Sequence, residues 1–184
     1  MNSISKIISK SIFDNGDILD YEMHPNSSIE NFKILYEYVF KKKIPVVDSK
    51  IKVIYTNGYE YTLPISDNIF PLKDGKEFLV IFGEEPNSFS QIKQPPWYFP
   101  PPNNAAIYYS DGTLKHQLIS PIQDEGWYID RTWYMDYPEG TWQSKYNGFG
   151  FIVANDSRYP QGVFCLYDST PNLVLTSYEI DRSR

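Results

Sequence analysis

The chain has 184 residues, of which 41% are hydrophobic, and its 17 Lys and Arg against 23 Asp and Glu give a net charge of −6. This composition excludes an intrinsically disordered chain and is typical of one core or of two small modules that share one. The acidic balance argues against nucleic-acid binding, which favours a basic surface. The 16 Tyr, 11 Phe and 4 Trp favour strands and interfaces over helical bundles.

The first ten residues contain Lys6 and Lys10 where a signal peptide needs an unbroken apolar core. No apolar run approaches the ~20 residues that span a bilayer. Cys165 is the single cysteine, so it cannot form an internal disulfide, and we expect it to be a small buried side chain on a strand. These features predict a cytoplasmic protein without a membrane segment.

Asn-Gly and Asp-Gly pairs punctuate the chain, and such pairs tolerate the positive φ that tight hairpin turns require. They are Asn15-Gly16, Asn57-Gly58, Asp74-Gly75, Asp111-Gly112 and Asn147-Gly148. The first two predict hairpins over residues 11–23 and 51–63. The third leads into the apolar run 78–82, which is typical of a central strand.

Between the first two hairpins, residues 28–43 predict one amphipathic helix. Ser27 can cap it, and Glu30 completes a capping box. Its apolar residues fall on one face at the helical period, and they are Ile29, Phe32, Leu35, Tyr36, Val39 and Phe40. Lys41–Lys43 would end it, because positive charge favours the carbonyl end of a helix. Residues 1–83 are therefore predicted to form an α+β module.

Residues 84–104 form a connector with six prolines, in which neither a helix nor an inner strand can persist. At its centre lie Trp97, Tyr98 and Phe99, which we expect to pack onto a neighbouring sheet. A proline-rich ligand for an adaptor domain is the alternative interpretation.

Residues 105–184 read as an all-β module. A hairpin around Asp111-Gly112 opens it, and aromatic and β-branched runs near 126–135, 149–153, 162–167 and 173–178 predict further strands. This spacing indicates a β-meander or a small sandwich, which could share one sheet with the first module. The predicted fold class is α+β: predominantly antiparallel β-sheet with one amphipathic helix near the N-terminus.

Motifs for catalysis are missing from the sequence. His24 and His116 are the only histidines, no Cys or His has metal-site spacing, and neither a nucleophile elbow nor a phosphate loop is present. Paired carboxylates within residues 124–139 could in principle hydrolyse a glycoside, but acidic residues beside turns are usually solvated. We therefore expect no enzyme, no catalytic residue, no metal and no cofactor, and a structural role for both histidines.

The segment Pro121–Trp142 is both acidic and aromatic. Five acids against one base, Arg131, give it a net charge of −4. Large aromatic residues anchor interfaces, and acids around them attract a basic partner. The predicted partner-binding residues are Asp124, Glu125, Trp127, Asp130, Trp133, Asp136, Tyr137, Glu139 and Trp142. In the alternative reading, the tryptophans face the core and the acids only solubilise the loops.

Residues 103–118, with the sequence NNAAIYYSDGTLKHQL, resemble a stretch of small bacterial immunity proteins. These accompany the toxins of contact-dependent inhibition and related polymorphic toxin systems. The shared pattern is an Asn-Ala strand, an apolar and aromatic pair, an Asp-Gly turn and a Leu-Lys-x-x-Leu strand. The resemblance implies a cytoplasmic, non-catalytic protein that binds the C-terminal domain of one cognate toxin and blocks its active site. It assigns no individual residue a role.

The residues themselves agree with this expectation, because an acidic inhibitor suits a toxin whose cleft is basic, as in a nuclease. The alternative is a carbohydrate- or peptide-binding β module that uses tryptophans as a stacking platform. The candidates for that platform are Trp97, Trp127, Trp133 and Trp142.

Overall fold

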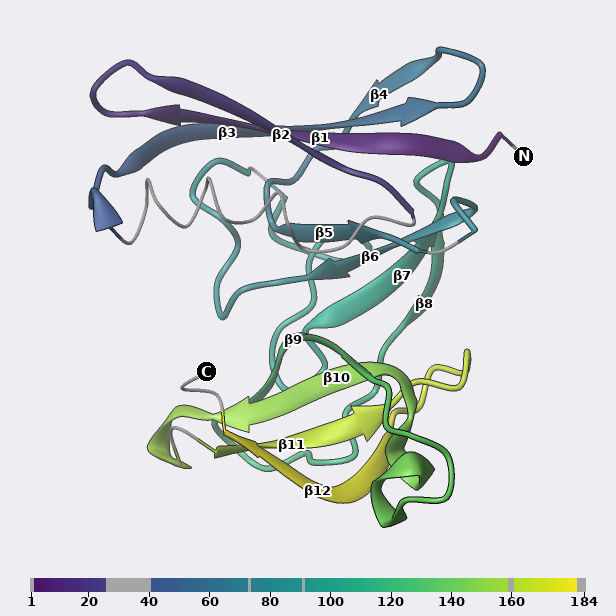
Figure 1. The fold of residues 1–184 in the computed structure, drawn as a ribbon. Helices are drawn as coiled ribbons and strands as arrows, with labels where there is room; N and C mark the ends of the chain where they lie inside the picture. Colours follow the sequence, from purple (N-terminus) through teal and green to yellow (C-terminus); the bar gives the residue numbers. More distant parts are fainter. Residues whose placement is uncertain (1, 26–40, 73, 91, 159–160, 182–184) are drawn as a thin grey trace. The chain divides into compact units, whose positions relative to one another are not determined.

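The computed structural model describes residues 2–25, 41–72, 74–90, 92–158 and 161–181. In this part of the chain, twelve strands form three four-stranded sheets with the orders β2-β1-β3-β4, β5-β6-β7-β8 and β12-β11-β10-β9 (Figure 1). Among these residues are two short 3-10 helices, η3 (Trp142–Tyr146) and η4 (Asp156–Arg158).

The predicted α+β class is therefore wrong, since strands make up 49% of the structure and helical residues 5%. The helix expected over residues 28–43 has most of its length in 26–40, outside the described residues. Of its expected last turn, Lys43 has a φ of 53°, which is not helical. The prediction gave one segment too much weight, because paired strands predominate in the described ranges both before residue 84 and after residue 104.

The first sheet consists of β1 (Ile4–Phe13), β2 (Ile18–Met23), β3 (Val46–Tyr55) and β4 (Glu60–Thr62). Strand β1 pairs antiparallel with β2 on one side and with β3 on the other. The Asn15-Gly16 and Asn57-Gly58 turns join β1 to β2 and β3 to β4, and their glycines have φ of 84° and 82°. Both predicted hairpins are confirmed, because Gly adopts this left-handed conformation without strain.

The second sheet consists of β5 (Asn68–Pro71), β6 (Glu77–Ile81), β7 (Ala105–Tyr109) and β8 (Leu114–Gln117). The Asp74-Gly75 turn lies between β5 and β6, and the Asp111-Gly112 turn joins β7 to β8. Strands β6 and β7 are buried along almost their whole length. Such continuous apolar runs are typical of strands covered on both faces, which confirms the predicted central strand over 78–82.

The third sheet is a meander of β9 (Trp127–Met135), β10 (Gly148–Asn155), β11 (Gln161–Leu166) and β12 (Val174–Asp181). One of its faces carries a core cluster of Met135, Tyr146, Ile152, Phe164 and Ile180. Gly150 lies where a Cβ would be 2.2 Å from the carbonyl oxygen of Cys165. The close packing of β10 against β11 therefore requires a glycine at this position.

The chain divides into two compact units. Unit 1 comprises residues 1–80, 85–98 and 107–115, and unit 2 comprises 81–84, 99–106 and 116–184. Three of the five boundaries between the units fall inside strands β6, β7 and β8.

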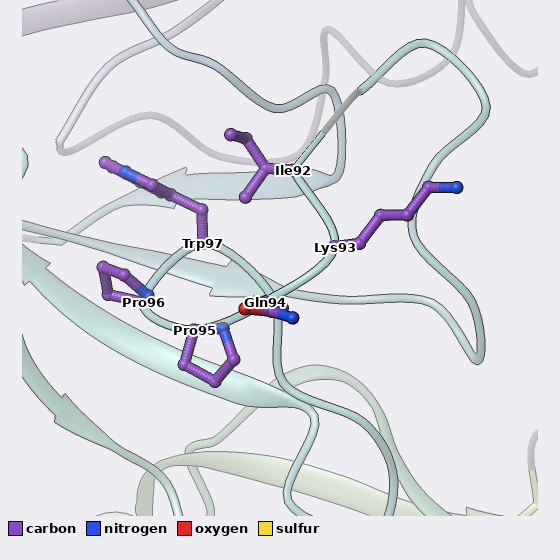
Figure 2. Close-up of a pocket in the computed structure, with 6 residues that line it drawn as sticks. All are labelled: Ile92, Lys93, Gln94, Pro95, Pro96 and Trp97. Atoms are coloured by element: carbon purple, nitrogen blue, oxygen red, sulfur yellow. The ribbon is translucent and has the colours of Figure 1, made fainter.

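In the aromatic centre of the connector, Trp97 packs onto a strand, as expected, and Phe99 contacts the residue that follows β6. In unit 1 the indole of Trp97 stacks on the ring of Tyr108 in β7, with the ring centroids 4.5 Å apart and the planes 6° from parallel. The Tyr108 hydroxyl donates a hydrogen bond to the carbonyl oxygen of Pro96. In unit 2 Phe99 is 7% exposed and contacts Phe82 edge to face. Figure 2 shows residues 92–97 of unit 1, which line a cavity of about 390 Å³ and include Trp97.

Candidate functional site

Strand β9 separates the predicted partner-binding residues into two groups. Asp124 and Glu125 precede the strand, Asp136 and Glu139 follow it, and nine residues of extended chain lie between the groups. At about 3.3 Å per residue, the two ends of the strand are roughly 25 Å apart. The structure therefore does not bring these acids into one compact patch.

The predicted aromatic residues differ sharply in exposure. Trp127, at the start of β9, is 7% exposed, so the alternative of a core-facing tryptophan describes it. Tyr137 is half-buried and packs against the core cluster. Trp133 is 38% exposed and Trp142 is 67% exposed. Tyr134, which the sequence-based set did not include, is 68% exposed.

The loop after β9 holds the exposed Trp142 in a fixed place. Its indole meets the ring of Tyr146 edge to face at 6.2 Å, and Tyr146 belongs to the core cluster. Asn147 closes the loop: its Oδ1 accepts a hydrogen bond from the backbone N–H of Tyr137 at 2.7 Å, and its Nδ2 donates to the Tyr137 carbonyl at 2.8 Å. The exposed indole of Trp142 therefore rests against a side chain of the core cluster.

The charges near β9 are also uneven. Asp130 is engaged by the neighbouring base, because its Oδ2 lies 2.9 Å from Nε of Arg131. Asp136 and Glu139 are exposed and lie in the chain between the exposed rings of Tyr134 and Trp142. We call Trp133, Tyr134, Asp136, Glu139 and Trp142 the β9–η3 surface, because they are exposed and close together in the chain. As consecutive strand residues, Trp133 and Tyr134 point to opposite faces of β9.

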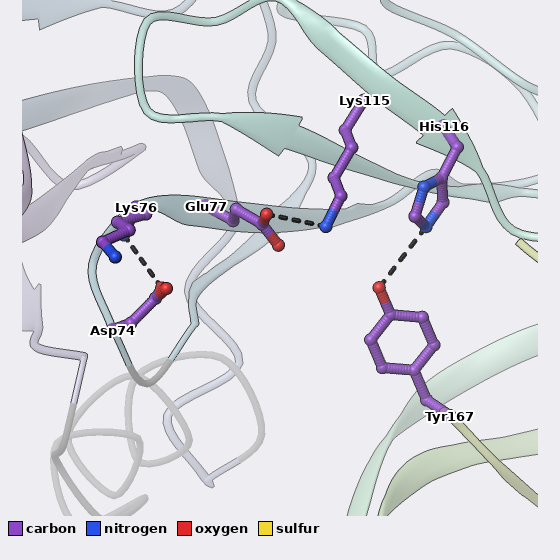
Figure 3. Close-up of polar contacts among 6 residues, drawn as sticks. All are labelled: Asp74, Lys76, Glu77, Lys115, His116 and Tyr167. Carbon is purple, nitrogen blue, oxygen red and sulfur yellow. Dashed lines mark hydrogen bonds and ion pairs between the residues drawn. The ribbon is translucent and has the colours of Figure 1, made fainter. Parts of the chain in front are cut away.

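The residues singled out for reactivity have structural surroundings. Nε2 of His116 lies 3.3 Å from the hydroxyl of Tyr167 in unit 2, whereas in unit 1 Nζ of Lys115 pairs with Oε1 of Glu77 at 2.7 Å (Figure 3). Cys165 is fully buried on β11, as expected, and burial raises the pKa of its thiol to about 12. His116 and Cys165 therefore fit the structural roles predicted for them.

Within the described ranges, no three His, Cys, Asp or Glu side chains gather closely enough to hold a metal ion. In the same part of the chain, no helix has both the length and the hydrophobicity that crossing a membrane would need.

Sequence reasoning missed a cavity of about 450 Å³ in unit 1. It is lined by Asn2, Tyr55, Tyr59, Tyr61, Ser110 and Asp111. Most of these residues flank two turns that were predicted, Asn57-Gly58 and Asp111-Gly112. The tyrosines beside the first turn were a visible signal, but nothing in the sequence showed that the two turns meet.

No protein-family model, curated protein or solved structure matches this chain. Its function is therefore argued from its own residues.

Proposed function

We propose that this protein is a bacterial immunity protein that binds a cognate toxin domain through the β9–η3 surface and blocks its active site. The observation that carries the proposal is the exposure of two large aromatic rings, Tyr134 at 68% and Trp142 at 67%, with the exposed acids Asp136 and Glu139 between them in the chain. As an immunity protein it would act in the cytoplasm, against a toxin that reaches that compartment.

The exposed rings support binding because water solvates them poorly. A tryptophan buries up to about 250 Å², so covering the exposed two thirds of Trp142 would remove roughly 170 Å² from water, worth about 4 kcal/mol before the costs of association. Trp142 already contacts Tyr146 edge to face, so part of its side-chain freedom is restricted before binding. These are the properties of an interface anchor.

The carboxylates indicate the charge of the partner. Asp136 and Glu139 would meet Lys or Arg side chains of the toxin and would speed encounter with it. A toxin that cleaves nucleic acid binds phosphates in a basic cleft, so the inhibitor's carboxylates would occupy the places of those phosphates. A nuclease-like active site is therefore the target that this surface suits best.

The test is a binding and protection experiment with the toxin domain encoded beside this protein. We expect W142A to weaken binding by about 2 kcal/mol, or roughly 30-fold, and to reduce protection of cells that express the toxin. We expect D136N/E139Q to slow association at low salt by roughly tenfold. The matched control D124N/E125Q changes the charge equally at the other end of β9 and should have a smaller effect.

Unchanged affinity in both W142A and D136N/E139Q would rule out this surface. Absence of any binding to the adjacent toxin domain would rule out the immunity function itself.

A carbohydrate- or peptide-binding module remains the second candidate, because an exposed indole such as that of Trp142 can stack on a sugar ring. Trp127 is buried and offers no platform, whereas Trp97 has one face covered by Tyr108 and also lines the cavity formed by residues 92–97. A glycan array read out with tryptophan fluorescence separates the two functions: saturable glycan binding that W142A abolishes, without toxin binding, would favour this candidate.

A further inference from the structure

The cavity in unit 1 gathers three tyrosines on one side. Tyr61 lies in β4 and Tyr59 directly precedes that strand, so the two side chains, two residues apart, share one face of the hairpin. Tyr55, at the end of β3, donates its backbone N–H to the carbonyl of Tyr59 at 3.0 Å. The rings of Tyr55 and Tyr59 lie 5.7 Å apart and are tilted by 34°. The aromatic side of the cavity is thus built by one regular hairpin.

The turn between β7 and β8 supplies Ser110 and Asp111 to the lining of the cavity. The hydroxyl of Tyr55 donates a hydrogen bond to the carbonyl oxygen of Ser110, which anchors this turn to the hairpin. Gly112, with a φ of 85°, lies so close that a Cβ would be 3.2 Å from Cε1 of Tyr61. The approach of the two turns is therefore specified by a hydrogen bond and by a glycine.

Asp111 is the one charged side chain among the residues that line the cavity. Oδ1 of Asp111 accepts hydrogen bonds from the backbone N–H of Thr113 at 2.9 Å and from its hydroxyl at 2.6 Å, and these bonds hold the pKa of the carboxyl below its usual value. Burial, with a further contribution from the charge of Asp111, raises the pKa of Tyr55. None of the six residues that line the cavity is positively charged.

Two of the hydroxyl groups that line the cavity are already engaged within the protein. The hydroxyl of Ser110 donates to the carbonyl of Asn2 at 2.8 Å, and the hydroxyl of Tyr55 is also engaged. A bare ammonium group carries three donors, and it would have to exchange its water shell for the carboxylate of Asp111 and a few neutral oxygens of Asn2, Tyr59 and Tyr61. An alkylated ammonium has few or no donors, and aromatic faces together with one anionic group attract it well.

From this geometry we infer that the cavity formed by Tyr55, Tyr59, Tyr61 and Asp111 is a binding site for an alkylated ammonium group. A cavity of about 450 Å³ has room for such a group with part of the molecule that carries it. The group could belong to a free small molecule such as choline or to a methylated lysine side chain. This inference is independent of toxin binding.

Isothermal titration calorimetry of the full chain tests the inference with choline, with a short trimethyllysine peptide and with 3,3-dimethyl-1-butanol, the uncharged isostere of choline. We expect at least one of the two cations to bind about tenfold tighter than the uncharged isostere, and the tighter one identifies the source of the group. We expect Y59A and D111N each to weaken that binding about tenfold.

Three variants keep the test specific. Y59F retains the ring and should bind within about twofold of the unmodified protein. D111N retains an oxygen that can accept from Thr113, so the turn is preserved while the charge is lost. Y134A removes an equally exposed tyrosine of unit 2 and should bind normally.

Equal affinity for choline and its uncharged isostere would overturn the inference, because it would show an apolar cavity without cation recognition. Tighter binding of the unmethylated lysine peptide, or no saturable binding of either cation at about 10 mM, would overturn it as well.

Discussion

The side chain of Asn104 offers the sharpest test of how unit 2 is held together. Asn104 is 2% exposed, and its Nδ2 donates to the carbonyl oxygens of Phe82 at 2.7 Å and of Ile129 at 3.0 Å. Its Oδ1 accepts from the backbone N–H of Ile129 at 2.7 Å. One buried amide thus joins residues that are 22 and 25 positions away in the chain.

Replacing Asn104 by Ala removes all three hydrogen bonds and leaves a small void. At about 1 kcal/mol for each buried bond, we expect the free energy of unfolding to fall by about 3 kcal/mol. For a chain of this size, such a loss lowers Tm by roughly 6–12 °C. Urea unfolding followed by near-UV circular dichroism measures the first quantity, and scanning calorimetry measures the second.

Asn103 is the matched control, because its side chain also makes hydrogen bonds but is half-exposed. Water can replace the exposed partner Gln123, but the backbone N–H of the buried Ser120 also loses its acceptor, so we expect N103A to cost about 1–2 kcal/mol. Equal losses for N103A and N104A, or a loss below about 1 kcal/mol for N104A, would refute the argument that burial gives Asn104 its importance.

Three further predictions concern other parts of the chain. G150A places a Cβ 2.2 Å from the carbonyl oxygen of Cys165, so we expect the free energy of unfolding, measured in urea, to fall by at least about 3 kcal/mol. As a control, G16A lies in open space at a positive φ and should lower it by about 1 kcal/mol. Because the pKa of Cys165 is raised to about 12 from an ordinary 9.0, the unfolded chain releases this proton first, and stability should fall as pH rises from about 9 towards 12. C165A should show a shallower fall, and a slope identical to that of the unmodified protein would contradict the assignment. A double-mutant cycle with E77Q and K115M should give a coupling of about 1 kcal/mol, since both side chains are only 20–24% exposed; zero coupling would count against it.

The local part of the fold could be predicted from the sequence because turn chemistry is local. The Asn15-Gly16, Asn57-Gly58 and Asp111-Gly112 turns lie where they were expected, each with a glycine at positive φ between paired strands. Which strands are neighbours could not be predicted. Strand β6 lies beside β7, although more than twenty residues separate them in the chain, and no local pattern encodes that choice.

The candidate site was harder to predict, because exposure depends on packing that sequence patterns do not reveal. The mixed periodicity of residues 126–135 has a structural cause. The pairing of β9 with β10 shifts register between Ile152 and Val153, opposite Asp130, and this irregularity interrupts the alternation of the strand. The sequence pattern therefore did not distinguish Trp127 from Trp142, although the first is buried and the second is exposed.

The path of the chain through the two units limits how this protein can be divided. The chain passes from one unit to the other five times, after residues 80, 84, 98, 106 and 115. No single cut yields two complete halves, and a fragment that ends at residue 104 lacks β7 and leaves the edge of β6 open to pairing with other molecules. Recombination between genes would therefore have to transfer both units together. If the chain were split into two fragments for a complementation assay, the fragments would expose strand edges and tend to aggregate.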